Sequence, residues 1–600
     1  MLGGRKLRLG AVALLAVVAM ACNGLTVNER GVYTSSPTTT FTGKVAVADG
    51  DSLASLKVNG VDATVNGGDF TAEIPVDGAA ILNPVTVVAT YTSGAVLRER
   101  RTVVYGDGNH AVVLPPGATI DDAVGLRINE RSFTKLGPVV KNLTTIDTAS
   151  IAPPGTVFLD ECITQVIVCT LSAKATTAAA PTIRDFTVAL DSNQGNVKAV
   201  VTLQGMHVPV NVAARIAGIP ANCSMNVDAS TITIDGNYTL RPNPADPKFL
   251  DVNLVGASPT VTLNGVTHDF VGGICSIPGI EQIVNLFLPD VQTLMHDKLT
   301  VLLGDPDGGG PADSPVADAV EAALAKLNIA GDIGTALGLT LDSKLQSASP
   351  DPSGIGLRAT AAFTASGVAP EAPDLPGSVA FPGESLGALP GTSPGGKAFD
   401  VAVGASASGF NQLLAGETER GLLNVNVTSL GGQPLTLKGL YDLIGAGGLV
   451  TQDHPLAISL RPEVAPIVTT GAGPDGALGE LKFSGYRATI RSTDDNKVFL
   501  ELVLDFRTGV GMVLQNGGLA FTFAPPAAGD LTATITQNPN KLPDALVQQV
   551  FQQLSPQVFA SVQDVLPSFP LPQFAGLNLS LVEISRVGSG FVLFADLVPA

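Results

Sequence analysis

The sequence contains one motif that could support nucleophilic catalysis. Residues 383–387 read Gly-Glu-Ser-Leu-Gly, and this G-x-S-x-G pattern is where hydrolases carry a reactive serine. A serine of that kind needs an apolar strand before it and a helix after it. Pro382 precedes the motif here, and a segment rich in Pro and Gly follows it. We therefore predict no nucleophile at Ser385; an esterase is only a third interpretation, which labelling of Ser385 by a serine-directed probe would revive.

The patterns that bind metal ions are also incomplete. The histidines have neither HxH nor HExxH spacing; they are His110, His207, His268, His296 and His454. Asp305-Pro306-Asp307-Gly308 resembles the start of a calcium loop, but the later acidic ligands and the closing Glu are missing. The sequence predicts a protein that is not an enzyme and that needs neither a metal nor another cofactor.

The first 21 residues have the pattern of an export signal. Arg5, Lys6 and Arg8 precede a short apolar run, and Ala19-Met20-Ala21 is a small-x-small cleavage site. Cleavage there would leave Cys22 first, which resembles a bacterial lipoprotein, although Leu usually stands at the place of Ala19. We predict a chain exported and anchored to the bacterial envelope, at the periplasmic or surface face of the outer membrane, by lipid on Cys22. The alternative is ordinary secretion.

The cysteine count agrees with lipidation. Four cysteines remain once Cys22 is set aside, and an even number suits an oxidising compartment. Three pairings are open. The pairing with the shortest loops joins Cys162 to Cys169 and Cys223 to Cys275, and it is the one we favour.

Composition limits the partners. The net charge of −19 repels nucleic acid, so we expect no nucleic-acid partner. Only 14% of the residues are charged, and the mean hydropathy is +0.33. No segment after the signal is long and apolar enough to span a bilayer. Such an apolar chain has either a large core or an apolar cavity filled by ligand, and composition does not separate the two.

The positional patterns divide the chain into segments. Residues 22–40 are expected to be a polar tether, and residues 41–108 a small β-sandwich with a hairpin at Asn59-Gly60. This sandwich resembles the bacterial immunoglobulin-like modules, which are usually spacers. Residues 367–398 are rich in proline and predict an extended linker between a first unit, 109–366, and a second unit, 399–600.

Two amphipathic stretches indicate that these units repeat one design. Residues 283–299 and 550–566 align with a constant offset, with Pro289 matching Pro556. A proline inside a helical pattern kinks the helix, so finding it twice indicates duplication. Phe133-x-x-Leu136 and Phe410-x-x-Leu413 mark an earlier matching helix start in each unit. The predicted class is α+β, with each long helix burying one stripe against a sheet.

The order of these motifs resembles the bactericidal/permeability-increasing and lipid-transfer family over residues 109–600. The likeness is carried by VGLRINERSFTKLGPVV from Val124, by the segment from Asp400 that includes Gly421-Leu422-Leu423, and by the closing segment from Leu566. It implies two tandem tubular lipid-binding domains, each with a long kinked helix wrapped by a curved antiparallel sheet. The residues it implies on or beside apolar grooves are Phe133, Leu136, Ile283, Phe287, Val291, Leu294, Phe410, Leu413, Val550, Leu554 and Val558.

The chain also departs from that family. Animal members join a strand to the long-helix region through a cysteine, whereas Cys275 lies before the helix, and Cys162–Cys169 has no counterpart. The basic tip that grips lipopolysaccharide in some members is missing, so that activity is not carried over. The resemblance implies non-enzymatic binding, transfer or presentation of a lipid or other acyl-chain ligand at the cell envelope. The alternative is an adhesion or scaffold lipoprotein that keeps the fold without a ligand, and plain packing is the alternative role for the groove residues.

Overall fold

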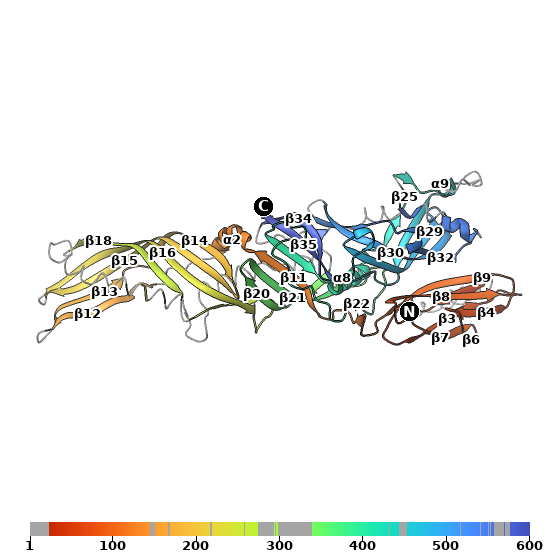
Figure 1. Ribbon diagram of the computed structural model, residues 1–600, viewed down its shortest axis with the longest axis horizontal. Coiled ribbons are helices and arrows are strands. Elements are labelled where there is room, and N and C mark those ends of the chain that lie inside the picture. The colour runs from red at the N-terminus through yellow and green to blue at the C-terminus, as the bar shows by residue number, and fades with distance from the viewer. Residues whose placement is uncertain are drawn as a thin grey trace, which may run out of the picture.

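A computed structural model gives the fold. It describes residues 23–143, 149, 152–165, 169–216, 219–256, 259–273, 293, 296–297, 300, 339–430, 432–442, 453–515, 518–539, 542–549, 551, 554–556, 569–570 and 577–599. The molecule is elongated (Figure 1), with one large sheet at one end, a central sheet in the middle, and a second large sheet beside an N-terminal sandwich at the other end.

The N-terminal sandwich consists of two sheets packed face to face. One has the order β1 (Gly24–Val27), β3 (Thr38–Ala46), β7 (Asp69–Pro75), β6 (Thr64–Asn66). The other has the order β2 (Gly31–Thr34), β9 (Val96–Tyr105), β8 (Leu82–Tyr91), β4 (Leu53–Val58), β5 (Val61–Asp62). Phe41, Phe70 and Val87 belong to the buried apolar cluster between them.

Two sequence predictions meet the structure in this sandwich. Asn59 and Gly60 both have positive φ, 46° and 83°, as a two-residue type I′ turn requires, and β4 pairs with β5 across them, so the predicted hairpin is confirmed. The tether expected over residues 22–40 is different from what is found. β1 pairs with β3, and β2 pairs in parallel with β9. In β1 Val27 is buried while Thr26 is exposed, so this strand turns one face to the core.

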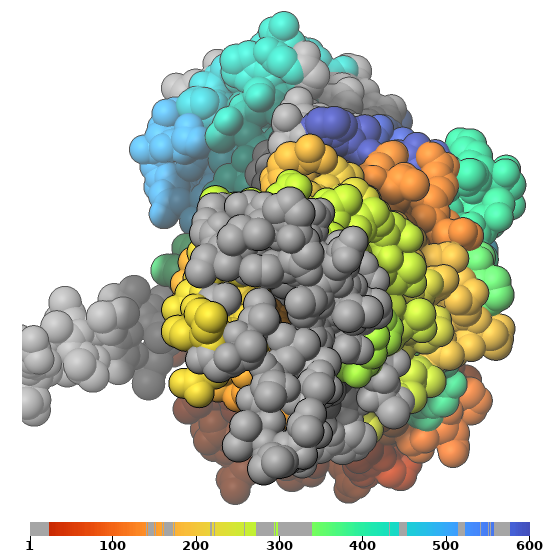
Figure 2. Space-filling view, turned by 90° about the vertical axis from the view of Figure 1, so that its left-hand side faces the viewer, coloured from red at the N-terminus to blue at the C-terminus, as the bar shows by residue number. Residues whose placement is uncertain are grey.

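The first large sheet is built on a very long hairpin, β15 and β16. Its order is β12-β13-β15-β16-β17, with β14 also paired to β15 and β18 also paired to β16. The strands are β12 (Val157–Gln165), β13 (Cys169–Thr177), β14 (Thr182–Asn193), β15 (Asn196–Ile216), β16 (Ile219–Pro242), β17 (Leu250–Leu254) and β18 (Thr260–Gly273). Figure 2 views the molecule from the end at which this sheet lies.

Both halves of the chain share the central sheet. Its order is β19 (Leu339–Asp342), β21 (Gly354–Ala365), β11 (Ile120–Asn129), β23 (Val401–Ala405), β35 (Gly590–Val598), β34 (Asn578–Val587), with β20 (Leu345–Asp351) also on β21. β11 and β23 pair antiparallel at the middle, and each also pairs with a later hairpin of its own half. The topology therefore repeats around the β11–β23 contact.

The second large sheet is also built on a long hairpin, β29 and β30. Its order is β24-β27-β29-β30-β31-β33, with β28 also on β29 and β32 also on β30. The strands are β24 (Val425–Val427), β27 (Leu456–Pro462), β28 (Ile467–Val468), β29 (Gly479–Ser492), β30 (Val498–Gln515), β31 (Gly518–Phe523), β32 (Leu531–Gln537) and β33 (Phe569–Pro570). Two short ladders complete the described strands: β10 (Val112–Leu114) with β22 (Ser378–Ala380), and β25 (Ser429–Leu430) with β26 (Gln433–Pro434).

The predicted α+β class is wrong. Strands dominate the described residues, and the described helical segments are short: residues 544–549 and the elements η1 (Glu130–Ser132), α2 (Phe133–Leu143), α8 (Ala407–Glu419), α9 (Leu437–Asp442), η4 (Pro474–Gly476) and η5 (Ala528–Asp530). No long kinked helix is found within these residues, so the expected tubular arrangement is not supported. The prediction overweighted two helical stripes, whereas strand-forming alternation of Val, Ile and Thr runs through far more of the chain.

The proline-rich segment at residues 367–398 is a packed strap. It contains β22, and Leu386 and Leu389 lie in a buried cluster with Phe399 and Phe594 on the central sheet. Its apolar side chains are spaced without a period, because each packs individually against an existing surface. The strap is extended, as expected, but it is held on the molecule.

Candidate functional site

The inner face of the first large sheet carries a large apolar cluster. β15 and β16 point alternate side chains to this face, and these are nearly all buried. The face is rich in Val, with Met206 and Met225 near its middle, and Met is the side chain that adapts most easily to irregular neighbours. Its buried members on the two strands are Val201, Leu203, Met206, Val208, Val210, Val212, Cys223, Met225, Val227, Ala229, Ile232 and Ile234.

A line of residues that are left out of the strand pairing crosses this sheet without a change of register. In four neighbouring strands one residue is skipped by the pairing at the same level: Arg184, Gly205, Ser230 and Gly265. Gly205 and Gly265 have φ of +62° and +60°, a backbone conformation that glycine adopts without strain. Because the register is the same on both sides of the line, these positions are breaks in the pairing and not β-bulges. The alternation changes phase across the line, so the apolar residues stay on one face on both sides of it.

The length of this face sets the size of ligand that it could hold. β15 has 21 residues and β16 has 24. At about 3.3 Å per residue, each strand is on the order of 70–80 Å long. An extended acyl chain of 16 to 18 carbons is much shorter than this face, so the dimensions suit acyl chains with room to spare.

The second large sheet also has an apolar inner side. Phe483 stacks on Phe506, with ring centroids 4.4 Å apart, and Tyr486 lies beside both. Residues 544–549 are helical, and Val547, Phe551 and Leu554 are buried in the same cluster. A neighbouring cluster, which we name the α8 cluster, joins Phe410, Val468, Leu481, Val510 and Phe591, with half-buried Leu413, Leu414, Leu478, Phe483, Met512 and Phe523 packed on it.

The sandwich docks on the outer side of the second sheet at a bulge. Arg100 of β9 donates from Nε and Nη2 to Asp505 Oδ2, at 3.0 and 2.6 Å, and Thr102 and Ser484 share a hydroxyl hydrogen bond of 2.8 Å. The pairing of β29 with β30 shifts register between Phe483 and Tyr486, and the bulge residue Gly485 donates its N–H to Asp505 at 3.0 Å. The bulge thus presents polar groups to the sandwich.

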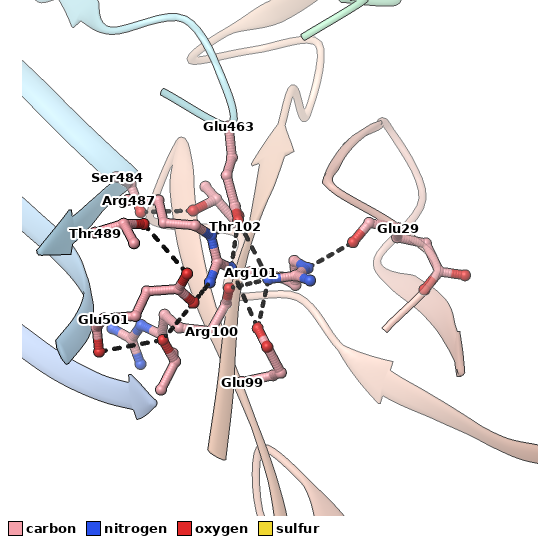
Figure 3. A network of polar contacts seen from close by, with 12 residues as sticks. Glu29, Glu99, Arg100, Arg101, Thr102, Glu463, Ser484, Arg487, Thr489 and Glu501 are labelled. Atoms are coloured by element: carbon pink, nitrogen blue, oxygen red, sulfur yellow. Dashed lines mark hydrogen bonds and ion pairs between the residues drawn. The ribbon is translucent and has the colours of Figure 1, made fainter. Parts of the chain in front are cut away.

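A buried ion-pair network completes this junction (Figure 3). Arg101 of β9 contacts Glu99 at 2.7 Å and Glu463 at 3.2 Å, while Arg487 of β29 contacts Glu463 at 2.7 Å, Glu99 at 3.2 Å and also Glu501. Three carboxylates therefore share two guanidinium groups. Burial raises the pKa of Glu463, and the two arginines oppose that shift. Sequence reasoning missed this junction, because no local pattern connects residues nearly 400 positions apart.

The predicted groove residues fall into different places. Phe133 and Leu136 are buried under the central sheet and the base of the first sheet, in a cluster with Ile128. Phe410 and Leu413 belong to the α8 cluster. Leu554 is buried against the second sheet. The remaining candidates lie outside the described residues: Ile283, Phe287, Val291, Leu294, Val550 and Val558.

The cysteine predictions are only partly within the described structure. Cys22 and Cys275 lie outside the described residues. Cys162 is in β12 and Cys223 in β16, and both are disulfide-bonded. Their partners are not among the described contacts, so the pairings Cys162–Cys169 and Cys223–Cys275 stay predictions.

The serine and histidines considered above for catalysis or metal binding contact neighbouring side chains and backbone groups. Ser385 donates to Asp122 at 3.2 Å and accepts from the Gly387 N–H, on the strap and without a helix following it. His207 pairs with Asp228 at 2.7 Å, and His110 with Asp107 at 2.6 Å, at separate places on the surface. Within the described ranges, no three His, Cys, Asp or Glu side chains are grouped to hold a metal ion.

Comparisons with known proteins show partial likeness. No protein-family model and no curated protein matches the chain. Among solved structures, a lipopolysaccharide binding protein is similar over 80% of this chain and 100% of its own, at 14% identity and a TM-score of 0.39. P47 from Clostridium botulinum A2 is similar over 79% of this chain and 97% of its own, at 10% identity and a TM-score of 0.22. Chimeric titin Z1Z2 is similar over 34% of this chain and 96% of its own, at 12% identity and a TM-score of 0.12.

None of the three likenesses assigns a fold family or a ligand to this chain. Of the helices that the structure describes, none is both long and apolar enough to cross a membrane.

Proposed function

We propose that this protein is a non-enzymatic lipid-binding protein that holds acylated lipids on the apolar inner faces of its two large sheets. The observation that carries the proposal is the inner face of β15 and β16, which is apolar and continuous over two strands of more than 20 residues. A sheet with one long apolar face suits a flexible hydrocarbon chain. The ligand class is one whose long apolar part is covered while its polar part remains near water.

The physical driving force is the transfer of hydrocarbon out of water. Each CH₂ group that leaves water contributes about 0.8 kcal/mol, so a 16-carbon chain contributes up to about 12 kcal/mol before the costs of binding are subtracted. No covalent chemistry is required. The protein carries or presents the lipid at the bacterial envelope, to which the predicted lipid on Cys22 attaches it. The charge of −19 suits neither nucleic acid nor anionic headgroups as partners.

The first experiment looks for lipid in the protein itself. The protein is purified from its membrane, examined by native mass spectrometry and extracted for lipid, and the delipidated protein is then offered a fluorescent fatty acyl probe. We expect additional mass that extraction removes, and saturable uptake of the probe. A homogeneous unliganded mass together with no uptake contradicts the proposal and favours the scaffold alternative.

The second experiment locates the acyl chain. The chain has no tryptophan, so a Trp introduced by substitution can be excited selectively at wavelengths that its tyrosines do not absorb. Met225→Trp places it on the inner face, and Ser224→Trp places it on the exposed outer face of the same strand. A lipid with a brominated acyl chain should quench the first and not the second. Equal quenching of both, or uptake without quenching at Met225→Trp, contradicts binding at this face.

The scaffold alternative has one observation in its favour. The sandwich is joined to the second sheet by buried ion pairs and hydrogen bonds, as a rigid spacer would be. A rigid spacer is also compatible with a lipid carrier held away from its membrane. The uptake experiment therefore decides between the two.

A further inference from the structure

One buried carboxyl group lies in the interior of the second half without a partner. Glu417 is in the last turn of α8, is only 4% exposed, and neither of its side-chain oxygens has a hydrogen-bond partner among the described residues. The carbonyl end of a helix disfavours a negative charge, so this position favours the neutral acid. Burial raises the pKa of Glu417 to about 8, with Arg420 opposing the shift.

The other polar side chains of α8 have hydrogen-bond partners, which makes the missing partner of Glu417 among the described residues unusual. Asn411 donates to the Val468 carbonyl and accepts from the Val468 N–H. Gln412 accepts from the Phe363 N–H and donates to the Ala118 carbonyl. Thr418 donates to the Leu414 carbonyl.

The start of the helix is equally well satisfied. Glu384 accepts from the N–H groups of Ala407 and Ser408 at 2.7 and 2.9 Å, and Ser406 caps Gly409. Glu419, two residues beyond Glu417, accepts from the Leu375 N–H. The Glu417 carboxyl is therefore an exception among the buried polar side chains of this helix, because the others named here have hydrogen-bond partners.

The helical repeat shows which way Glu417 faces. Residues three, four and seven positions apart lie on one side of an α-helix, and Glu417 follows Leu414, Leu413 and Phe410 at those spacings. These three residues pack in the α8 cluster, where Phe410 lies 5.4 Å from the Phe591 ring. The carboxyl therefore extends a stripe of apolar side chains, several of which are only half buried.

We propose that Glu417 is the polar recognition residue of a lipid site in the second half, where it donates a hydrogen bond to an ester or amide carbonyl of an acylated lipid. The acyl chain lies along the α8 cluster. This inference rests on the proposed function and adds the chemical group that is recognised. A neutral carbonyl fits best because it accepts a hydrogen bond without bringing charge into an apolar region, whereas a phosphate would bring a negative charge there.

The test compares two probes that differ in one group. Delipidated full-length protein is titrated at pH 6.5 with a pyrene-decanoic methyl ester and with the matching pyrene-decyl methyl ether, which has no carbonyl. Wild type should bind the ester about tenfold more tightly, which is the size of one hydrogen bond made in an apolar site. Glu417→Leu should remove this preference and leave ether binding unchanged, while Glu417→Gln, which still donates, should keep most of it.

The controls separate this inference from the proposed function. Glu419→Gln, in the same turn, should behave as wild type, and the ester preference of wild type should fall above about pH 8 while that of Glu417→Gln does not. Equal binding of ester and ether, or a preference that survives in Glu417→Leu, overturns the role of Glu417 and leaves lipid binding standing. Binding of neither probe to any variant overturns the proposed function itself. If Glu417→Leu does not fold, the pH dependence of wild type against Glu417→Gln decides.

Discussion

Arg487 should be essential for the attachment of the sandwich. Its guanidinium contacts Glu99 of the sandwich and Glu463 and Glu501 of the second half, and all four side chains are at most one-fifth exposed. In Arg487→Met, three buried carboxylates remain with Arg101 as their one cation in the network. Removing one partner of a buried ion pair costs about 3–5 kcal/mol, because the remaining charge is left without compensation.

The pH dependence of this loss follows from Glu463. Burial already raises the pKa of Glu463, and losing Arg487 removes an interaction that opposes that shift. An acid whose pKa is higher in the folded state stabilises the fold below its unfolded pKa, and that stability is lost as pH rises through the folded pKa. The deficit of Arg487→Met relative to wild type should therefore be larger at pH 8 than near pH 5, where Glu463 takes up a proton.

Thermal unfolding and hydrogen exchange of the β9 amides, measured at several pH values, check this prediction. Arg98→Met is the matched control, because Arg98 is on the same strand but 41% exposed and 3.9 Å from Asp544, a pair worth at most about 1 kcal/mol. Glu463→Gln combined with Arg487→Met should recover part of the loss. The reasoning is refuted if Arg487→Met costs no more than Arg98→Met, or if its cost does not change with pH.

Two further predictions concern single carboxyl groups. The pKa of Glu417, raised from 4.5 to about 8, implies that the fold loses about 5 kcal/mol of stability as pH rises from 4.5 to 8. The unfolding midpoints of wild type and Glu417→Gln should therefore diverge over that pH range. Parallel curves of midpoint against pH contradict the prediction. Asp400, fully buried, accepts from Lys135 at 2.5 Å and from the Leu597 N–H at 2.8 Å, and forms an ion pair with Arg131 at 3.0 Å. Asp400→Ala should lower the free energy of unfolding by about 3 kcal/mol in denaturant titration, and a loss below about 1 kcal/mol would show that these contacts are replaced by water.

The parts of the fold that the sequence predicts correctly are the ones determined by local patterns. The Asn59-Gly60 turn needs two residues with positive φ, and few other dipeptides provide them. β14 and β15 coincide with apolar residues that alternate in the sequence, because a period of two with β-branched residues has few other solutions.

The parts of the fold that the sequence does not predict depend on contacts between residues far apart in the chain. The two helical stripes predict an α+β protein, because the period of a single stretch says nothing about how many residues elsewhere in the chain form strands. The strap at residues 367–398 looked like a linker because Leu386 and Leu389 have no period, and they pack only when the central sheet is present. Arg100 and Arg101 look like surface charges in the sequence, and their partners are hundreds of residues away.

Glu417 was not recognised for a related reason. In the sequence it is an ordinary acidic residue near a helix end, next to other polar residues. Only the packing of α8 against β11, β21, β22 and β28 shows that the helix is enclosed. One signal was present: Glu417 follows Phe410 and Leu414 at helical spacing, so an apolar stripe ended in an acid.

The contrast between the two buried acidic regions supports a ligand at Glu417. At the sandwich junction, three buried carboxylates are matched by two guanidinium groups and several hydroxyls, so this fold places cations where it buries acids for structural reasons. At Glu417 no hydrogen-bond partner is found among the described residues, and Arg420 acts on it only as a charge, although leaving a buried polar group unpaired costs about 1–3 kcal/mol. A leucine there would remove that cost without changing the helix. The retained carboxyl is therefore best explained by a group that reaches it from outside the chain, and an acyl ester or amide satisfies both the acid and the apolar stripe that leads to it.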